Sequence, residues 1–199
     1  MNETRAQSLV ARLARALDGR APRFAERDEP FKEAAVALIL HARGDDDDAD
    51  LLLIRRATRE GDPWSGQIGL PGGGHDRADE SLEATALRET AEEVGLDVLS
   101  AGRVIGQLDE LRPRTPVLPP VIVRPFVCVV DELPSLVLSE EVAEARWVPV
   151  SELFAPGAKV DTTVRVRDLH MRTTAYQHGD FTIWGMTERI LQTFEELWR

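Results

Sequence analysis

Hydrophobic residues follow two different spacings along the chain. In residues 3–17 and 187–198 they recur every three or four positions, which predicts an amphipathic helix at each end. Shorter apolar runs between these ends predict β-strands, at residues 34–40, 51–54, 104–108, 121–130, 145–148 and 181–184. A helical turn is expected at residues 151–154, and residues 164–171 alternate between apolar and polar positions. Because the strands show no regular β-α-β alternation, the pattern indicates a mixed sheet between helices.

The breaks between these elements indicate one domain with an N-terminal extension. Pro22 and Pro30 bracket a connector, so we expect a helix and connector over residues 1–30 and one domain over residues 31–199. The acidic run at residues 45–48 lies between two predicted strands. We expect it to form a solvated hairpin turn, because aspartates favour turns and the run lacks the spacing of a calcium loop.

Composition narrows the classes of partner. The chain has 199 residues, 43% of them hydrophobic, and a net charge of −11, which argues against nucleic acid and anionic membranes as partners. No apolar run approaches the roughly 20 residues that a membrane-spanning helix needs, and the first residues do not resemble a secretory signal. The single cysteine, Cys128, lies in a predicted strand and is expected to be a buried structural thiol. We therefore expect a cytoplasmic protein.

The most informative segment is a further predicted helix at residues 79–94, with Asp79 as its expected N-cap. Glu89, Glu92 and Glu93 are spaced i, i+3 and i+4, so they are expected to share one side of this helix. The opposite side is expected to carry a buried apolar stripe, formed by Leu87, Ala91 and Val94. Like charges on one helix face are destabilising. A divalent cation bound through carboxylate oxygens would offset that repulsion.

A solvated, purely structural helix is the alternative interpretation of these charges, with Arg88 paired to Glu92. Glycines on both sides of the helix favour a binding site instead. The three glycines at residues 72–74 allow a backbone that approaches a ligand closely. Gly95 is expected to be the left-handed residue that ends the helix.

The spacing of these glycines and charged residues resembles the Nudix box, Gly-x5-Glu-x7-Arg-Glu-aliphatic-x-Glu-Glu-x-Gly-aliphatic. Its fixed positions are occupied by Gly74, Glu80, Arg88, Glu89, Glu92, Glu93, Gly95 and Leu96. Thr90 stands where an aliphatic residue is usual. The resemblance to the Nudix hydrolase superfamily implies an α/β fold, in which a central mixed sheet lies between helices as an α/β/α sandwich.

The resemblance also implies a reaction and a site. Nudix hydrolases use water to split the diphosphate of a nucleoside diphosphate that is linked to another group. The implied cofactor is Mg²⁺ or Mn²⁺. The implied metal ligands are Glu89, Glu92, Glu93 and the backbone carbonyl of Gly74, and the implied catalytic residues are Glu89, Glu92 and Arg88. Arg88 is expected to brace the carboxylates, and Glu80 to order the turn before the helix.

A separate general base is harder to place. In several relatives a glutamate from a distal loop has this role, and the candidates by position are Glu140, Glu141 and Glu144. Each of them also has a plain interpretation as a surface residue. Activation of water by the cation alone would make such a base unnecessary.

Parts of the chain resemble the coenzyme A diphosphatase subgroup. The matching elements are Arg56-Ala57, Gly66-x3-Leu70-Pro71-Gly72-Gly73 and Trp184-Gly185-Met186-Thr187. A central arginine of the subgroup pattern is missing, with Asp62 close to its expected position. The match implies cleavage of coenzyme A or acyl-coenzyme A into 3′,5′-ADP and 4′-phosphopantetheine. Arg55 and Arg56 are the expected phosphate contacts, and Arg56 is expected to read the 3′-phosphate.

Other substrates and partners stay open. Arg59, Arg112 and Arg114 are further candidates for phosphate contacts. ADP-ribose and dinucleoside polyphosphates are alternative substrates, and a non-catalytic Nudix-fold nucleotide-binding module is a further alternative. A homodimer is also expected, because residues 3–17 and the segments around Trp64 and Trp147 offer apolar surface.

Overall fold

The structure is a computed structural model that describes residues 2–44, 47–59, 64–113, 120–166 and 169–199. Its helices are α1 (Asn2–Asp18), α2 (Leu82–Val94), α3 (Val98–Ala101), α4 (Val150–Leu153) and α5 (Gly185–Trp198). Its strands are β1 (Lys32–Ala42), β2 (Ala49–Arg56), β3 (Ile68–Gly69), β4 (Gly72–Gly74), β5 (Gly102–Gln107), β6 (Val121–Val130), β7 (Val142–Pro149), β8 (Lys159–Val166), β9 (Leu169–His178) and β10 (Phe181–Trp184). Asp62, Arg114 and two residues of the acidic run, 45 and 46, lie outside the described residues.

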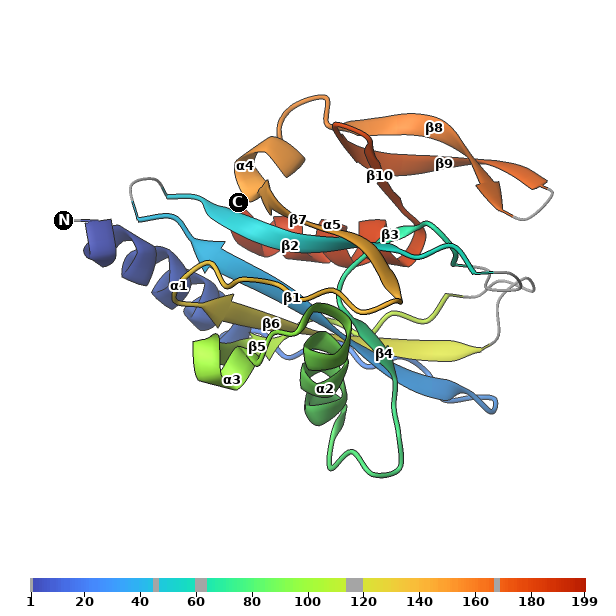
Figure 1. The fold of residues 1–199 in the computed structure, drawn as a ribbon, viewed down its shortest axis with the longest axis horizontal. Coiled ribbons are helices and arrows are strands. Elements are labelled where there is room, and N and C mark those ends of the chain that lie inside the picture. Colours follow the sequence, from blue (N-terminus) through green and yellow to red (C-terminus); the bar gives the residue numbers. More distant parts are fainter. Residues whose placement is uncertain (1, 45–46, 60–63, 114–119, 167–168) are drawn as a thin grey trace.

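A mixed sheet of seven strands forms the centre of the molecule (Figure 1). Its order is β3-β2-β1-β6-β5, with β4 paired to β1 and β7 paired to β2. β1 and β6 run parallel, whereas the other pairs are antiparallel. β1 is long enough to pair with β2 near its end and with β4 near its start. The mixed sheet predicted from the sequence is confirmed.

Helices cover both faces of this sheet (Figure 1). Successive side chains of a strand point to opposite faces, so neighbouring residues of β1 belong to different cores. Leu38 and Leu40 pack in the core that contains α1 and α5, whereas Ala37 and Ile39 pack in the core that contains α2. The α/β/α sandwich implied by the resemblance is therefore confirmed.

A second sheet, of three antiparallel strands in the order β10-β9-β8, was not predicted. The sequence pattern indicated one alternating segment at residues 164–171, whereas the structure has two long strands that pair with each other. Arg55 and Arg146 join this sheet to the main one, with their guanidinium carbons 4.8 and 4.0 Å from the centre of the Phe181 ring.

The start of α2 differs from its prediction. The helix begins at Leu82, and Ser81 is its N-cap, because the Ser81 hydroxyl accepts a hydrogen bond from the backbone N–H of Ala84 at 3.1 Å. Asp79 therefore is not the cap. The end of the helix agrees with its prediction, since Gly95 has a φ of 69° and closes it in the left-handed conformation.

The buried face of α2 is also rotated from the predicted one. Ala91 is exposed and Leu87 is only half-buried, whereas Glu93 is buried beside Val94. The helix packs on the sheet through Leu82, Thr85, Ala86, Thr90, Glu93 and Val94. The prediction placed Glu93 with the exposed carboxylates, and the structure corrects it because Glu93 faces the sheet.

Part of the acidic run that was expected to form a solvated turn is buried. Asp48 is buried, and its carboxylate accepts hydrogen bonds from the backbone N–H and the hydroxyl of Ser151, at 3.1 and 2.6 Å.

The single cysteine, Cys128, is buried as predicted. Burial raises the pKa of its thiol to about 12. A thiol with that pKa is not a nucleophile at neutral pH.

The apolar side chains of α1 are buried in the core of the same chain. Leu9, Leu13 and Leu17 are buried in the core, and Trp147 packs against the core under α2. These residues therefore do not supply the spare apolar surface from which a homodimer was expected, and the homodimer stays a prediction. Among the described residues, no helix has both the length and the apolar character needed to cross a membrane.

Candidate active site

Strand β4 brings the three glycines against α2. It pairs with the start of β1, so Gly72, Gly73 and Gly74 lie opposite Val36, Ala35 and Ala34. A Cβ on Gly73 would lie only 2.5 Å from the carboxyl carbon of Glu89. Glycine at this position is therefore what lets the Glu89 carboxylate lie against the backbone.

Arg88 is the centre of the ion-pair network on this side of α2. Its Nε and Nη2 donate to the two carboxylate oxygens of Asp79 at 2.9 and 3.0 Å, a forked pair. Its Nη1 donates to Glu89 at 2.8 Å and to Glu92 at 3.0 Å, and Nη2 also reaches the carbonyl of Gly74 at 3.3 Å. The bracing role expected for Arg88 matches these contacts.

Asp79 holds Arg88 from a nearly closed environment. Its side chain is 7% exposed and also accepts hydrogen bonds from the Thr85 hydroxyl at 2.8 Å and the Asp76 backbone N–H at 3.1 Å. The hydrogen bond from Arg88 holds the pKa of Asp79 far below its usual range. Glu80, the residue that the Nudix box led us to expect here, is exposed. Asp79 orders the turn before the helix in its place.

Glu93 is the most buried of the three box carboxylates. Its side chain is 4% exposed and accepts a hydrogen bond from the backbone N–H of Gly72 at 2.9 Å. Burial raises its pKa to about 7, against the opposing effects of that hydrogen bond and of the Arg56 charge. The negative charges of Glu89 and Glu141 raise it further.

The three carboxylates are not gathered around one point. In the part of the chain that the structure describes, no group of three or more Asp, Glu, His or Cys side chains is arranged to hold a metal ion. The contacts give the reason: Arg88 draws Glu89 and Glu92 toward itself, whereas Glu93 turns to the N–H of Gly72. The three residues share one side of α2 by their spacing, but their carboxylates do not converge on one point.

The donor chemistry nevertheless fits a hard divalent cation. Glu89 and Glu93 both border β4, and each carries oxygen ligands of the kind that Mg²⁺ and Mn²⁺ prefer. The repulsion that raises the pKa of Glu93 is the interaction that a cation would reverse. Glu89 and Glu92 would exchange part of their pairing with Arg88 for the cation.

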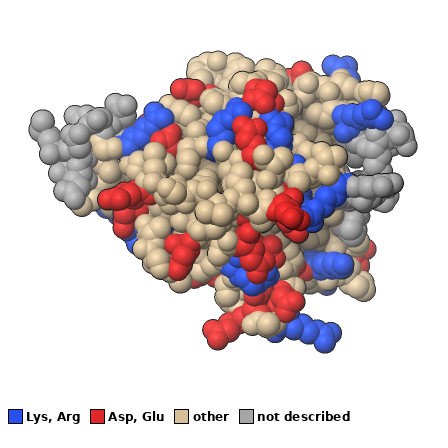
Figure 2. Space-filling model, in the orientation of Figure 1, with Lys and Arg blue, Asp and Glu red and all other residues tan. Residues whose placement is uncertain are grey.

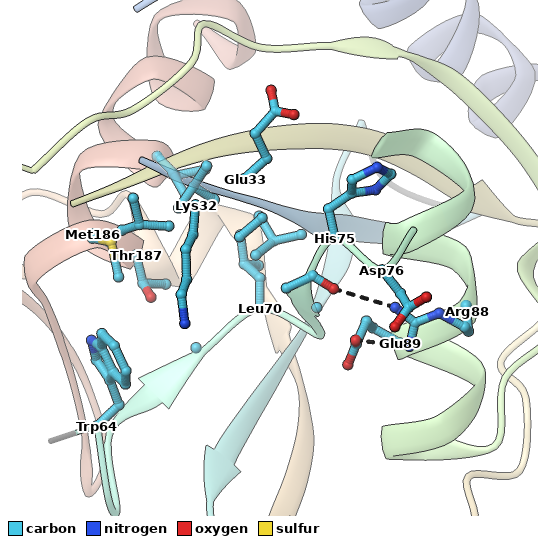
Figure 3. Close-up of a pocket in the computed structure, with 18 of the residues that line it drawn as sticks. Lys32, Glu33, Trp64, Leu70, His75, Asp76, Arg88, Glu89, Met186 and Thr187 are labelled. Atoms are coloured by element: carbon cyan, nitrogen blue, oxygen red, sulfur yellow. Dashed lines mark hydrogen bonds and ion pairs between the residues drawn. The ribbon is translucent and has the colours of Figure 1, made fainter. Parts of the chain in front are cut away.

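A cavity of about 1410 Å³ opens beside this network. Figure 3 shows His75, Asp76, Arg88 and Glu89 on one side of it, and Trp64, Met186 and Thr187 on the other. The wall thus combines β1, the segment before α2, α2 itself and the start of α5, which are far apart in the sequence. Figure 2 shows acidic side chains, with basic ones among them, gathered over α2 and the segment before it.

Arg56 and Arg55, the two expected phosphate contacts, lie in different surroundings in the structure. Arg56 lines the cavity, with its Nη1 3.7 Å from a Glu93 oxygen. Arg55 does not line the cavity, and it pairs with Glu144 at 3.1 Å and with Asp180 at 2.5 Å. The expectation for Arg55 as a substrate contact is therefore corrected.

Two other arginines are also engaged away from the cavity. Arg59 pairs with Glu141 at 2.9 Å. Arg112 is 6% exposed and is held by Asp28 and Glu29. Neither of these arginines lines the cavity.

The candidates for a distal general base also differ from one another. Glu144 is held by Arg55 and Arg146, and none of Glu140, Glu141 and Glu144 lines the cavity. Of these three, Glu141 is the one whose charge acts on Glu93.

Sequence reasoning missed several residues of the site. Asp79 was assigned to the helix cap, and Lys32 was not considered at all, although both line the cavity. The signal for Asp79 was its place next to Glu80, two acidic residues before one helix. Lys32 carried no local signal, because only the sheet brings it to the cavity.

Comparison with known proteins identifies the family. Residues 30–167 match the NUDIX domain family. The chain belongs to the Nudix hydrolase family. An uncharacterised Nudix hydrolase, NudL of Cronobacter sakazakii, is 35% identical over 149 residues, which cover 71% of this chain and 71% of that protein.

Other relatives match a smaller part of their own length. The peroxisomal coenzyme A diphosphatase ndx-8 of Caenorhabditis elegans is 33% identical over 125 residues, 62% of this chain and 51% of that protein. An uncharacterised protein of Schizosaccharomyces pombe is 40% identical over 110 residues, 53% of this chain and 33% of that protein. The chain thus spans about half of the worm protein and a third of the yeast protein.

A solved structure shows the same fold. The MutT/nudix family protein from Enterococcus faecalis superposes with a TM-score of 0.60 at 23% identity, covering 87% of this chain and 64% of that one. This likeness confirms the Nudix fold, while the family match and the Nudix hydrolase relatives confirm the enzyme class at the level of the family.

Substitutions just before α2 test whether Asp79 or Glu80 is the acidic residue that holds Arg88. Asp79→Asn should lower kcat about 10- to 100-fold, a range typical when a partner that orients a metal ligand is lost, because Arg88 loses its forked pair. Asp79→Glu should recover part of that loss. Glu80→Gln is the matched control, and we expect a smaller effect since Glu80 is exposed. Steady-state kinetics across a Mg²⁺ titration measure this, and a larger effect of Glu80→Gln would contradict the assignment.

The raised pKa of Glu93 makes a second prediction, for the metal-free protein. Between the ordinary value of 4.5 and the folded value of about 7, the folded chain binds more protons than the unfolded chain. The free energy of unfolding should therefore fall as the pH rises through this window, by roughly 2 kcal/mol between pH 5 and 8. Glu93→Gln removes this contribution. Urea unfolding in EDTA measures it, and parallel pH profiles for wild type and variant would contradict the shift.

Proposed function

We propose that the chain is a divalent-cation-dependent diphosphatase of nucleoside diphosphate derivatives, with coenzyme A or acyl-coenzyme A as the preferred substrate. One observation carries the proposal. Glu89 and Glu92 line a single large cavity together with Gly72, Gly74 and Arg56, and the Glu93 carboxylate lies 3.7 Å from the Arg56 guanidinium. This arrangement supports the proposal, because carboxylate oxygens would be available to a cation and a guanidinium to phosphate oxygens at the same end of the cavity.

The proposed roles follow from the contacts. Glu93, Glu89 and Glu92 would hold the cation, with the carbonyl of Gly74 beside them. When bound, Mg²⁺ or Mn²⁺ neutralises charge on the phosphate oxygens and makes water more acidic. Arg88 orients Glu89 and Glu92, since one of its nitrogens contacts both carboxylates. The Gly72 N–H fixes the orientation of Glu93.

Arg56 is the proposed contact for the diphosphate itself. Its guanidinium lies beside Glu93, at the end of the cavity that the carboxylates border. A planar guanidinium offers paired donors to phosphate oxygens. None of the three candidates for a distal general base is given the role of accepting the proton from the attacking water, because none lines the cavity and Glu141 pairs with Arg59.

Three observations support coenzyme A as the substrate. The worm relative is a coenzyme A diphosphatase by name. The segment that resembles the Trp-Gly-x-Thr element of this subgroup contributes Met186 and Thr187 to the cavity wall. The cavity volume of about 1410 Å³ exceeds the roughly 300–1,000 Å³ of pockets that take drug-sized ligands, which leaves room for a substrate larger than a simple nucleotide.

Product analysis tests the proposal. The purified protein is incubated with Mg²⁺ and with coenzyme A, dephospho-coenzyme A, ADP-ribose or a dinucleoside polyphosphate, and kcat/KM is measured for each. We expect coenzyme A to give the highest value and to release 3′,5′-ADP and 4′-phosphopantetheine. A clear preference for ADP-ribose would establish the alternative substrate. Tight binding without turnover of any compound would establish the nucleotide-binding module.

A further inference from the structure

The two ends of the cavity differ in chemistry (Figure 3). One end carries the ionic network of Arg88 and Glu89, where the diphosphate is proposed to bind. The other end is formed by Trp64 together with Met186 and Thr187 from the start of α5. This second end offers an indole ring and a thioether, surfaces suited to the flat face of a base.

Lys32 brings a positive charge to this second end. It is the first residue of β1, and alternation along the strand turns its side chain to the face opposite that of Glu33. In Figure 3 the Lys32 side chain extends into the cavity, and its ammonium points toward the side of Trp64 and Thr187. Among the described residues, no acceptor or carboxylate lies within bonding distance of this ammonium. The charge is therefore available to a ligand.

The other cations of the cavity wall are placed differently. Arg88 is bound to Asp79, Glu89 and Glu92, and Arg56 lies beside Glu93. Arg77 belongs to the segment between β4 and α2, on the side of the ionic network. A second anionic group of the substrate, held near Trp64, would thus meet Lys32 and not these arginines.

We propose that Lys32 binds a phosphate monoester on the nucleoside part of the substrate, while the base of that nucleoside packs on Trp64. The inference deepens the proposed function and rests on it. It assigns the 3′-phosphate of coenzyme A to Lys32 and orients the substrate with its 3′-phosphoadenosine toward α5. It also replaces the expectation that Arg56 reads this phosphate, since Arg56 lies at the carboxylate end of the cavity.

Binding of two nucleotides tests the assignment without any turnover. Isothermal titration calorimetry is carried out with 3′,5′-ADP and with 5′-AMP, which differ by the 3′-phosphate alone. We expect wild type to bind 3′,5′-ADP about five- to ten-fold more tightly, the scale of one charge-assisted contact at a solvent-accessible site. Lys32→Ala should abolish this ratio, and Lys32→Arg should retain most of it. Thermal unfolding should show that both variants remain folded, because the side chain is exposed.

Arg77→Ala is the matched control, since it removes one positive charge from the same cavity at the other end. It should keep the ratio between the two nucleotides, whatever it does to their absolute affinities. Equal affinities in wild type, or a ratio that survives Lys32→Ala, would overturn the assignment. A ratio that depends on Lys32 in a protein that does not hydrolyse coenzyme A would support the phosphate site and overturn the proposed function.

Discussion

Glu93→Gln is expected to lower kcat about 10³-fold, because several kcal/mol of metal-dependent stabilisation of the transition state are lost. The substitution keeps the size of the side chain and can keep its hydrogen bond from the Gly72 N–H, but it removes the charge that a cation would bind. The fold should remain intact, since burial disfavours the carboxylate form of Glu93 already.

Steady-state kinetics at saturating Mg²⁺, with thermal unfolding in parallel, measure this effect. The control is Asp161→Asn, which removes one carboxylate from an exposed position on β8 and should leave kcat unchanged. If Glu93→Gln turns over at nearly the wild-type rate, the assignment of Glu93 is wrong. A loss confined to KM would place Glu93 in substrate binding instead.

Alanine at each of the three β4 glycines should give three different results. A Cβ on Gly72 would lie 2.3 Å from the Ala35 carbonyl oxygen and 2.6 Å from the Val36 Cα, and the φ of Gly72 is +149°. Neither backbone atom can move away cheaply, so Gly72→Ala should destabilise the protein by roughly 2 kcal/mol or more.

Gly73→Ala should instead damage catalysis. Its Cβ would meet the carboxylate of Glu89 at 2.5 Å, the mobile end of a flexible side chain. The fold should tolerate this, while the displaced carboxylate lowers kcat about 100-fold, as misplacement by about an ångström does at other active sites.

Gly74→Ala completes the series, because nothing lies within 4 Å of its Cβ. It should lower kcat far less than Gly73→Ala and keep the backbone carbonyl. Unfolding temperature and kcat for all three variants check the series. Equal kcat values for Gly73→Ala and Gly74→Ala would contradict the close approach of β4 to Glu89.

The spacing of apolar residues predicted where most helices and strands lie, but not which of them pair or pack together. Apolar runs predicted β1, β2, β6 and the outer helices, because burial on one or both faces leaves a local pattern. The three-stranded sheet was missed, since its pairing of β8 with β9 depends on contacts between segments. The face of α2 was misjudged for a related reason: Thr85, Thr90 and Glu93 are buried there, and their residue types do not indicate burial.

Within α2, the spacing of charged residues was similarly informative about the candidate site. It identified Arg88 and the box glutamates, because their positions on one helix follow from its geometry. It did not distinguish Asp79 from Glu80 as the partner of Arg88, which depends on the path of the turn before α2. Nor did it separate Arg55 from Arg56, because the face that each residue of β2 presents depends on the register of the sheet.

The central claim is that the carboxylates of α2 bind a divalent cation. Titration of the protein with Mn²⁺, with free Mn²⁺ followed by electron paramagnetic resonance, tests it most directly. Wild type and Asp161→Asn should take up Mn²⁺ equally, and Glu93→Gln should bind it at least about ten-fold more weakly, as loss of one charged ligand implies. Equal Mn²⁺ affinity of Glu93→Gln and wild type would contradict the claim.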